Sequence, residues 1–170
     1  MKKVIIIGCP GSGKSTFSIR LESIIKLPLY HIDMMYWNQD KTKVDREVFL
    51  KRLSDTINLD KWIIDGNYYN TLEERIKQAD TIFLLDYPLD VCLSGIEERM
   101  GKKRDDNPFI EEGVDEEFLD FIKNFHRDLT PKIMDLLNKY SNNKMIYIFT
   151  SRKQGDAYLD ELERKYHEAK

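Results

Sequence analysis

Short apolar runs alternate with longer amphipathic segments along this chain of 170 residues. The runs that predict β-strands lie at about residues 3–7, 28–32, 62–65, 81–86 and 144–149. Several of these runs are apolar at consecutive positions, as expected for strands that helices cover on both faces. The alternation predicts an α/β fold in which helices wrap a parallel sheet.

The segments between the runs carry apolar residues every three to four positions, which is typical of amphipathic helices. Helices are predicted over residues 14–25, 45–57, 90 to about 100, 115–140 and 154–170. We expect Asp45 to cap the second helix and Pro131 to kink or split the fourth. Residues 101–114, GKKRDDNPFIEEGV, break the pattern and predict a charged loop. Such a loop is either a functional lid or a solvated connection.

Composition narrows the classes of protein. Hydrophobic residues make up 41% of the chain and charged residues 34%, a mixture typical of one globular domain. The formal net charge of -3 offers no general basic surface to nucleic acid or to an anionic membrane. The apolar run after Lys3 is too short for a signal peptide or a membrane span, so we expect a cytoplasmic protein. The two cysteines and three histidines are scattered, which indicates neither a disulfide framework nor a zinc site.

A phosphate-binding motif lies near the start of the chain. Residues 8–15, GCPGSGKS, match G-x-x-x-x-G-K-[ST] between a predicted strand and a predicted helix. We expect Lys14 to bridge the β- and γ-phosphates of ATP and Ser15 to coordinate Mg²⁺. Cys9 lies inside this loop at a helix N-terminus, so its pKa is expected to be lowered. The other residues predicted to bind the nucleotide here are Gly8, Pro10, Gly11, Ser12, Gly13 and Thr16.

Two other nucleotide-binding classes fit the motif less well. Thr16 stands where a dinucleotide-binding fingerprint needs its third glycine. No glycine has an aspartate three positions before it, as the D-x-x-G stretch of a GTPase switch requires. The compact class that remains is the small-molecule kinase.

A family resemblance rests on three segments, GCPGSGKST, WIIDGNY and ADTIFLLDYP, in this order and spacing. Over nearly its whole length the chain resembles the adenylate-kinase-related P-loop kinases. HIDMMYW and TSRKQGDAYL make it more similar to the branch often labelled DNA topology modulation proteins, or FlaR-like. The resemblance implies a P-loop three-layer α/β/α sandwich with a five-stranded parallel sheet in the order 2-3-1-4-5. It also implies one kinase domain over residues 1–170, an acceptor-binding helical segment at about 34–60, and a short lid at about 101–114.

The resemblance also implies roles for residues on the ATP side. Asp65, at the end of the third predicted strand, is expected to hold Mg²⁺ through water. Arg99, at the base of the lid, and Arg127, on the following helix, are expected to neutralise the transferring phosphoryl group. Arg152, just after the last strand, is expected to stack on the adenine. The alternative for Arg99 and Arg127 is a solvated basic stretch balanced by Glu111 and Glu112, and the alternative for Arg152 is an ordinary surface position.

The acceptor side begins at the end of the second predicted strand. Asp33 emerges there and is expected to accept a hydroxyl proton, as in uridine-kinase-like and shikimate-kinase-like relatives. Tyr36 and Trp37 are expected to stack on a ring or to close over a small substrate. The alternative is that Asp33 caps a turn and that both aromatic residues belong to the core.

The segment after Asp65 departs from the adenylate kinase pattern. The sequence reads DGNYYNT where adenylate kinases have D-G-F-P-R-T, and its next arginine is Arg75. The arginine that binds a phosphorylated acceptor is therefore missing, unless Arg75 turns inward. The acceptor contacts predicted in this segment are Asn67, Tyr68 and Arg75.

These residues predict a Mg²⁺-ATP-dependent phosphotransferase that acts on a nucleoside, a nucleotide or another small hydroxylated metabolite. The expected partners are ATP and this acceptor, with no membrane, and the protein is expected to be a monomer or a homodimer. The alternative is a nucleotide-binding regulatory or DNA-topology-associated protein, with Lys102, Lys103 and Arg104 contacting DNA. The acidic net charge makes DNA the less favoured partner.

Overall fold

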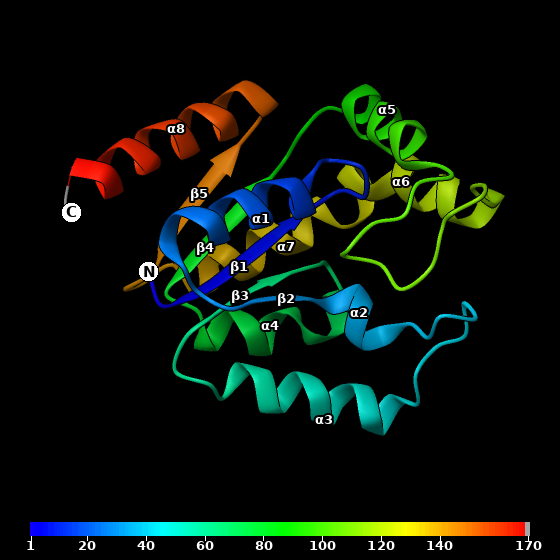
Figure 1. Ribbon diagram of the computed structural model, residues 1–170, viewed down its shortest axis with the longest axis horizontal. Coiled ribbons are helices and arrows are strands. Elements are labelled where there is room, and N and C mark those ends of the chain that lie inside the picture. The colour runs from blue at the N-terminus through cyan, green and yellow to red at the C-terminus, as the bar shows by residue number, and fades with distance from the viewer. Residues whose placement is uncertain (169–170) are drawn as a thin grey trace.

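Five parallel strands form one sheet at the centre of the computed structural model, which describes residues 1–168 (Figure 1). The strands are β1 (Lys3–Gly8), β2 (Leu29–His31), β3 (Trp62–Asp65), β4 (Thr81–Leu85) and β5 (Met145–Phe149). Their order across the sheet is β2-β3-β1-β4-β5, and every neighbouring pair is parallel. The predicted five-stranded parallel sheet and its 2-3-1-4-5 order are confirmed.

Helices cover both faces of the sheet and complete three layers (Figure 1). Helix α1 packs beside α8 on one face, and α4 packs beside α7 on the other. The right-handed rule for parallel crossovers explains this division. The connection through α1 leads from β1 toward the β2 edge of the sheet, whereas the connection through α4 leads from β3 toward the β5 edge, so the two helices lie on opposite faces. The described helices are α1 (Lys14–Ile25), α2 (Ile32–Tyr36), α3 (Arg46–Ile57), α4 (Tyr69–Gln78), α5 (Leu89–Arg99), α6 (Glu116–Asp128), α7 (Thr130–Lys139) and α8 (Arg152–Glu168).

Local sequence signals fix several helix ends. The Asp45 side chain caps α3, since it accepts hydrogen bonds from the backbone N–H groups of Glu47 at 2.9 Å and Val48 at 3.3 Å. Pro131 lies in the first turn of α7, so the long helical pattern is split into α6 and α7 as predicted. The last predicted helix begins at Arg152 rather than at residue 154, and residues 169–170 of that prediction lie outside the described residues.

Two helices, α2 and α4, are absent from the predicted elements. Helix α2 has five residues, too few for a 3.6-residue rhythm to be visible in the sequence. It begins at Ile32, where the second strand was expected to continue. Asp33 therefore lies in the first turn of a helix instead of at the end of a strand.

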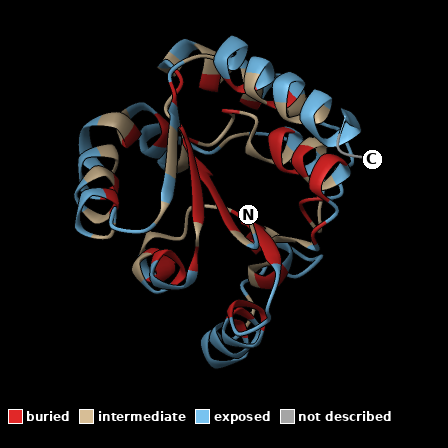
Figure 2. Cartoon of the chain, turned by 90° about the vertical axis from the view of Figure 1, so that its left-hand side faces the viewer, coloured by how far each residue is buried: buried red, intermediate tan, exposed pale blue. Residues whose placement is uncertain are grey.

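The core lies along the central strands, whose ribbons are red in Figure 2. All residues of β3 and β4 are buried, whereas the edge strand β5 exposes Met145 and Ile148. Trp62 is fully buried, and its indole N–H donates to the Ile57 carbonyl at 3.2 Å. Such packing makes the sheet a rigid support for the loops at its edge. None of the helices in residues 1–168 has the length and apolar content needed to cross a bilayer.

The register of the strands places the candidate functional residues at one edge of the sheet. Asp65 is the partner of Ile6 on one side and of His31 on the other. Strands β1, β2 and β3 therefore end together, where the loop before α1 begins. In open parallel sheets, ligands bind at this carboxyl edge.

Candidate active site

The loop between β1 and α1 has a backbone suited to binding an anion. Gly11 and Gly13 adopt φ angles of 82° and 90°, in the left-handed region that favours glycine. A Cβ atom on Gly11 would lie 2.0 Å from the Cys92 carbonyl oxygen, so no side chain fits there. Lys14 folds back over the loop, and its Nζ donates to the Cys9 carbonyl at 3.1 Å. The loop therefore offers an ammonium group and the free N–H groups of a helix start to an anion.

Helix α5 packs directly against this loop. A Cβ atom on Gly95 would lie 2.0 Å from the Gly11 carbonyl oxygen and 3.1 Å from a guanidinium nitrogen of Arg152. Arg152, in the first turn of α8, is thus brought beside the phosphate-binding loop. Its stacking on adenine stays a prediction.

We expect Gly95→Ala to weaken ATP binding, because the added methyl group pushes the Gly11 carbonyl and distorts the loop. Overpacking of this kind costs about 1–3 kcal/mol, which corresponds to about 5- to 150-fold in Kd where the whole cost falls on the loop conformation that binds ATP. Isothermal titration calorimetry with a non-hydrolysable ATP analogue measures the change. Ser94→Ala is the matched control, since Ser94 is exposed and bonds only Glu98 along the same helix. Equal ATP affinity in wild type and Gly95→Ala would show that the contact between Gly95 and Gly11 does not influence nucleotide binding.

Cys9 does not have the predicted lowered pKa. Its thiol is buried against Cys92 of α5, and its sulfur lies 3.9 Å from the Ile122 carbonyl oxygen. The hydrogen bond with Cys92 and burial both raise the pKa of Cys9. The prediction is wrong because the side chain faces the core, where a thiolate is poorly solvated, and not the open helix start.

Asp65, the predicted Mg²⁺ contact, lies buried at the end of β3 with both of its oxygens bonded. Oδ2 accepts from the Ser18 hydroxyl at 2.7 Å, and Oδ1 lies 2.9 Å from Nδ1 of His31. Burial lowers the pKa of His31, but the bond to Asp65 outweighs burial and the net shift is upward. Ser18 is one turn beyond Ser15, whose carbonyl it contacts at 2.9 Å. This placement is compatible with a metal contact made through water; His31 and Ser18 were not singled out from the sequence.

The lid segment, residues 101–114, reaches the phosphate-binding loop through Asp106. The Ser15 hydroxyl donates to the Asp106 carboxylate, and the Arg104 guanidinium binds the same carboxylate, with Nε 2.8 Å from Oδ1. Asp106 is only 5% exposed. Burial raises its pKa, but the bonds from Arg104 and Ser15 prevail and lower the pKa to about 2. The carboxylate is therefore ionised at neutral pH, and nothing in the charged string RDD distinguished Asp106 from its neighbour.

Arg99 and Arg104, the two arginines of the predicted lid, share one acidic partner. Glu111 Oε2 lies 2.6 Å from Arg99 Nε and 2.9 Å from a terminal nitrogen of Arg104. Arg99 is therefore paired with Glu111, and its role in neutralising the transferring phosphoryl group stays a prediction. The basic cluster that motivated the DNA-binding hypothesis is largely neutralised, with Lys102 and Lys103 as its exposed cations.

Arg127 lies on α6 with its side chain turned to solvent. The side chain is 72% exposed and pairs with Asp128 at 2.6 Å. The inward face of α6 is occupied instead by Ile122, Phe125 and His126, whose Nε2 lies 2.9 Å from the Tyr87 carbonyl oxygen. The structure therefore does not bring Arg127 to the phosphate-binding loop, contrary to the prediction from the sequence.

Asp33, predicted to lie on the acceptor side, is in the first turn of α2, at the same edge of the sheet as Lys14. Its Oδ1 accepts a hydrogen bond from the Tyr68 hydroxyl at 2.8 Å. Burial raises the pKa of Asp33, while Tyr68 and the charge of Lys14 partly oppose this effect. Burial likewise lowers the pKa of Lys14, and the negative charges of Asp65 and Asp33 oppose it. A half-buried carboxylate with a raised pKa, at the same edge of the sheet as the lysine of the phosphate-binding motif, is suited to accept a proton.

Aromatic rings join the acceptor segment to the lid. The ring of Tyr36 lies 4.6 Å from that of Tyr68 and 5.0 Å from that of Trp37. Trp37 in turn meets Phe109 of the lid, with ring centroids 5.9 Å apart. Tyr36 and Trp37 thus lie beside the carboxylate that the sequence placed with them, and they form an apolar wall near Asp33.

Arg75 turns inward, but its guanidinium binds the backbone of its own chain. It is fully buried and donates to the carbonyls of Gly66 at 2.9 Å, Tyr68 at 3.2 Å and also Asn67. Burial lowers the pKa of Arg75 to about 9. Asn67 meanwhile accepts from the Gly8 backbone N–H at 3.1 Å. Asn67 and Arg75 therefore fix the loop after β3 against the phosphate-binding loop. Both terminal nitrogens of Arg75 are engaged by carbonyls, and the Nε, which has no partner among the described residues, is buried.

We expect Arg75→Met to destabilise the protein, because three partly buried carbonyl groups lose the donor that the buried guanidinium provides. Hydrogen bonds to charged groups contribute about 1.5–3 kcal/mol, so we expect a loss of that order in the free energy of unfolding. Urea denaturation followed by circular dichroism measures this loss. Arg52→Met is the control: Arg52 is exposed on α3 and bonds one carbonyl, that of Met35. An unchanged urea midpoint in Arg75→Met would show that the carbonyl contacts contribute no net stability.

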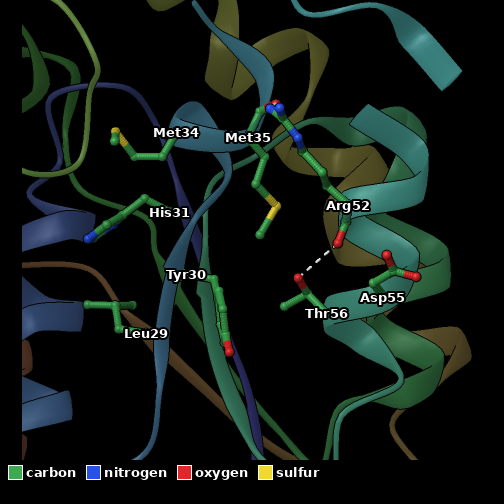
Figure 3. Close-up of a pocket in the computed structure, with 8 residues that line it drawn as sticks. All are labelled: Leu29, Tyr30, His31, Met34, Met35, Arg52, Asp55 and Thr56. Atoms are coloured by element: carbon green, nitrogen blue, oxygen red, sulfur yellow. Dashed lines mark hydrogen bonds between the residues drawn. The ribbon is translucent and has the colours of Figure 1, made fainter. Parts of the chain in front are cut away.

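A separate open cleft of about 650 Å³ lies between β2 and α3 (Figure 3). Met35 points into the gap between these two elements, whereas His31 points away from it, toward Asp65. This cleft lies on the outer side of β2 and not over the phosphate-binding loop. Its lining residues are Leu29, Tyr30, His31, Met34, Met35, Arg52, Asp55 and Thr56.

The oxygen atoms around Ser15 are suited to Mg²⁺. Within residues 1–168, no group of three or more histidine, cysteine, aspartate or glutamate side chains is arranged to hold a metal ion. Ser15 instead contributes a hydroxyl, which donates to the Asp106 carboxylate. The Asp65 carboxylate accepts from Ser18, one turn further along α1. Mg²⁺ prefers such hard oxygen ligands and usually completes its shell with water and substrate phosphates.

Comparison with known proteins places the fold among small-molecule kinases. No protein-family model matches the chain, and no curated protein matches it. Among solved structures, shikimate kinase from Bacteroides thetaiotaomicron is 18% identical, with 96% of this chain and 97% of that chain covered and a TM-score of 0.52. Shikimate kinase from Acinetobacter baumannii in complex with shikimate is 14% identical, with 100% and 95% covered and a TM-score of 0.54. A gluconokinase from Sinorhizobium meliloti 1021 is 13% identical, with 97% and 89% covered and a TM-score of 0.54. At these identities the likeness establishes the P-loop kinase type of α/β fold and nothing finer.

Proposed function

We propose that this protein is a Mg²⁺-ATP-dependent phosphotransferase that acts on a hydroxyl group of a small acceptor. One observation carries the proposal: Lys14 begins α1 after β1, and the half-buried carboxylate of Asp33, held by Tyr68, lies in the first turn of α2 after β2, at the same edge of the sheet. A phosphate-binding amine and a candidate proton acceptor thus share one edge of the sheet. The fold neighbours support the proposal, since they are kinases of small molecules.

The chemistry follows from the positions of these groups. The loop from Gly8 to Thr16 would hold the phosphates of ATP, with Lys14 at the β- and γ-phosphates. The acceptor hydroxyl gives its proton to Asp33 as its oxygen bonds the γ-phosphorus, and the bond from phosphorus to the ADP oxygen breaks. Arg99, which pairs with Glu111 in this structure, would exchange that partner for the transferring phosphoryl group. When bound, Mg²⁺ supplies further neutralisation of phosphate charge, and Ser15 and Asp65 would hold it.

The surroundings of Asp33 favour an acceptor that carries no phosphate. Arg75, the candidate phosphate contact, is engaged by the backbone carbonyls of residues 66–68. Tyr36 and Trp37 instead offer aromatic faces, on which a sugar or a base can stack. We therefore favour a nucleoside or another hydroxylated metabolite over a nucleoside monophosphate. The resemblance to the FlaR-like branch stays a prediction and specifies no acceptor.

The test is a transfer assay with γ-labelled ATP and Mg²⁺ against panels of nucleosides, nucleoside monophosphates, sugars and hydroxy acids. We expect labelled product with at least one neutral hydroxylated acceptor. Calorimetry with a non-hydrolysable ATP analogue runs in parallel and reports nucleotide binding by itself. Intact ATP binding without transfer to any panel would contradict the proposed activity.

A further inference from the structure

We infer that the lid supplies a ligand to the magnesium shell: Asp106 contacts the metal of bound Mg²⁺-ATP, directly or through one water. The inference rests on the proposed function and adds a residue that the sequence did not single out. It gives the lid a chemical role besides the charge neutralisation expected of Arg99.

The position of Asp106 relative to Ser15 is the first argument. Ser15 is the P-loop residue whose hydroxyl faces a metal, and this hydroxyl donates to the Asp106 carboxylate. Asp65 bonds Ser18 instead, one turn further along α1. Adjacent oxygens around Mg²⁺, with bonds of about 2.0–2.1 Å at right angles, lie about 3 Å apart, close to the spacing of hydrogen-bonded oxygens. A metal ion beside these two oxygens therefore requires the side chains to separate slightly, while the Ser15 hydroxyl keeps its proton and turns it away from the metal.

The charge and the orientation of Asp106 are the second argument. A buried carboxylate is costly unless it is paired, and Asp106 is 5% exposed and paired with Arg104. Arg104 contacts both oxygens of the carboxylate, from Nε and from a terminal nitrogen, which fixes its plane. Oδ2 is also the oxygen that accepts from Ser15. Arg104 thus acts as an outer-shell residue that holds a ligand in place, a usual feature of metal sites.

The third argument concerns the second carboxylate. Asp106 accepts from Ser15 and Asp65 accepts from Ser18, two residues one turn apart near the start of α1. Two carboxylates therefore approach the start of α1, Asp65 from the sheet and Asp106 from the lid. A divalent cation between them would relieve their repulsion and would link the lid to the bound nucleotide.

The same contact admits the opposite role, in which Asp106 competes with the phosphates of ATP for the phosphate-binding loop. The two roles predict opposite changes in Asp106→Asn. If Asp106 is a metal ligand, removing its charge weakens nucleotide binding, and it does so only when Mg²⁺ is present. If Asp106 competes with the phosphates, removing its charge makes nucleotide binding tighter, with or without Mg²⁺.

The experiment is calorimetric titration of the full chain with a non-hydrolysable ATP analogue, in Mg²⁺ and again in EDTA. Losing a metal ligand or its support typically costs 10–100-fold in metal affinity, so we expect Asp106→Asn to weaken binding in Mg²⁺ by about 10–100-fold. We expect no change in EDTA. Asp105→Asn, at the exposed neighbouring position, is the matched control and should behave as wild type in both conditions.

A second variant separates loss of the ligand from damage to the lid. Asp106→Cys replaces a hard oxygen with a soft sulfur, so Cd²⁺ should restore nucleotide affinity where Mg²⁺ does not, and Asp105→Cys should show no such rescue. Unchanged Mg²⁺-dependent binding in Asp106→Asn, tighter binding in both conditions, or absence of the Cd²⁺ rescue overturns the inference. Those outcomes leave the proposed function intact, because wild-type binding and transfer are measured separately. Wild type that binds no nucleotide in Mg²⁺ overturns both.

Discussion

Lys14→Ala is expected to abolish measurable phosphoryl transfer. Its amine lies over the phosphate-binding loop and is the cation that this motif offers to the β- and γ-phosphates. Removing one preorganised group that stabilises transition-state charge costs about 10²–10³ in kcat, and Lys14 also contributes to the ground-state binding of ATP. Steady-state assays with the acceptor identified by the transfer screen give kcat and KM for ATP.

The control for this variant is Lys123→Ala, which removes an exposed lysine from α6. It should leave both kinetic constants unchanged. Circular dichroism should show that Lys14→Ala retains the fold, because the lysine bonds a single carbonyl, that of Cys9. A Lys14→Ala protein with wild-type kcat would mean that phosphates bind elsewhere, and the proposed function would then have no basis in this loop.

The sheet and the phosphate-binding loop could be predicted from the sequence because both depend on local patterns. Consecutive apolar residues identify strands that are covered on both faces, and Gly11 and Gly13 mark a turn that only glycine adopts at low cost. The strand order came from the family resemblance, and the structure confirms it. Local patterns of this kind remain visible whatever the rest of the chain does.

The side-chain contacts of the site could not be predicted in the same way, because they join residues far apart in the chain. Ser15 and Asp106 are separated by 91 positions, and Tyr68 and Asp33 by 35. Arg75 shows the difference most clearly. The sequence indicated an arginine in the right segment, but whether it binds a ligand or three carbonyls depends on how α4 packs. The prediction for Arg127 failed for a similar reason. A shift of one or two positions along α6 turns a side chain from the core to solvent, and Arg127 lies on the solvent side.

Asp33→Asn is expected to retain ATP binding and to lose transfer. The substitution keeps the size of the side chain and its bond with Tyr68 but removes the carboxylate that accepts the hydroxyl proton. General base catalysis contributes about 10²–10⁴ in rate, so kcat should fall by that factor while the Kd of the ATP analogue stays within twofold or so. Asp120→Asn, on the exposed side of α6, is the control. Full activity in Asp33→Asn would show that another group takes the proton.

The pH dependence gives a separate test of the same assignment. Asp33 must be ionised to accept a proton, and burial raises its pKa, so kcat/KM should fall on acidification at a pH above the ordinary aspartate value of about 4. The Tyr68 hydrogen bond acts in the opposite direction, because it stabilises the charged form. Tyr68→Phe should therefore move the acid limb to higher pH, and the residual activity of Asp33→Asn should lack this limb. A profile that is unchanged in Tyr68→Phe would separate the titrating group from Asp33 and would assign the proton transfer to a different residue.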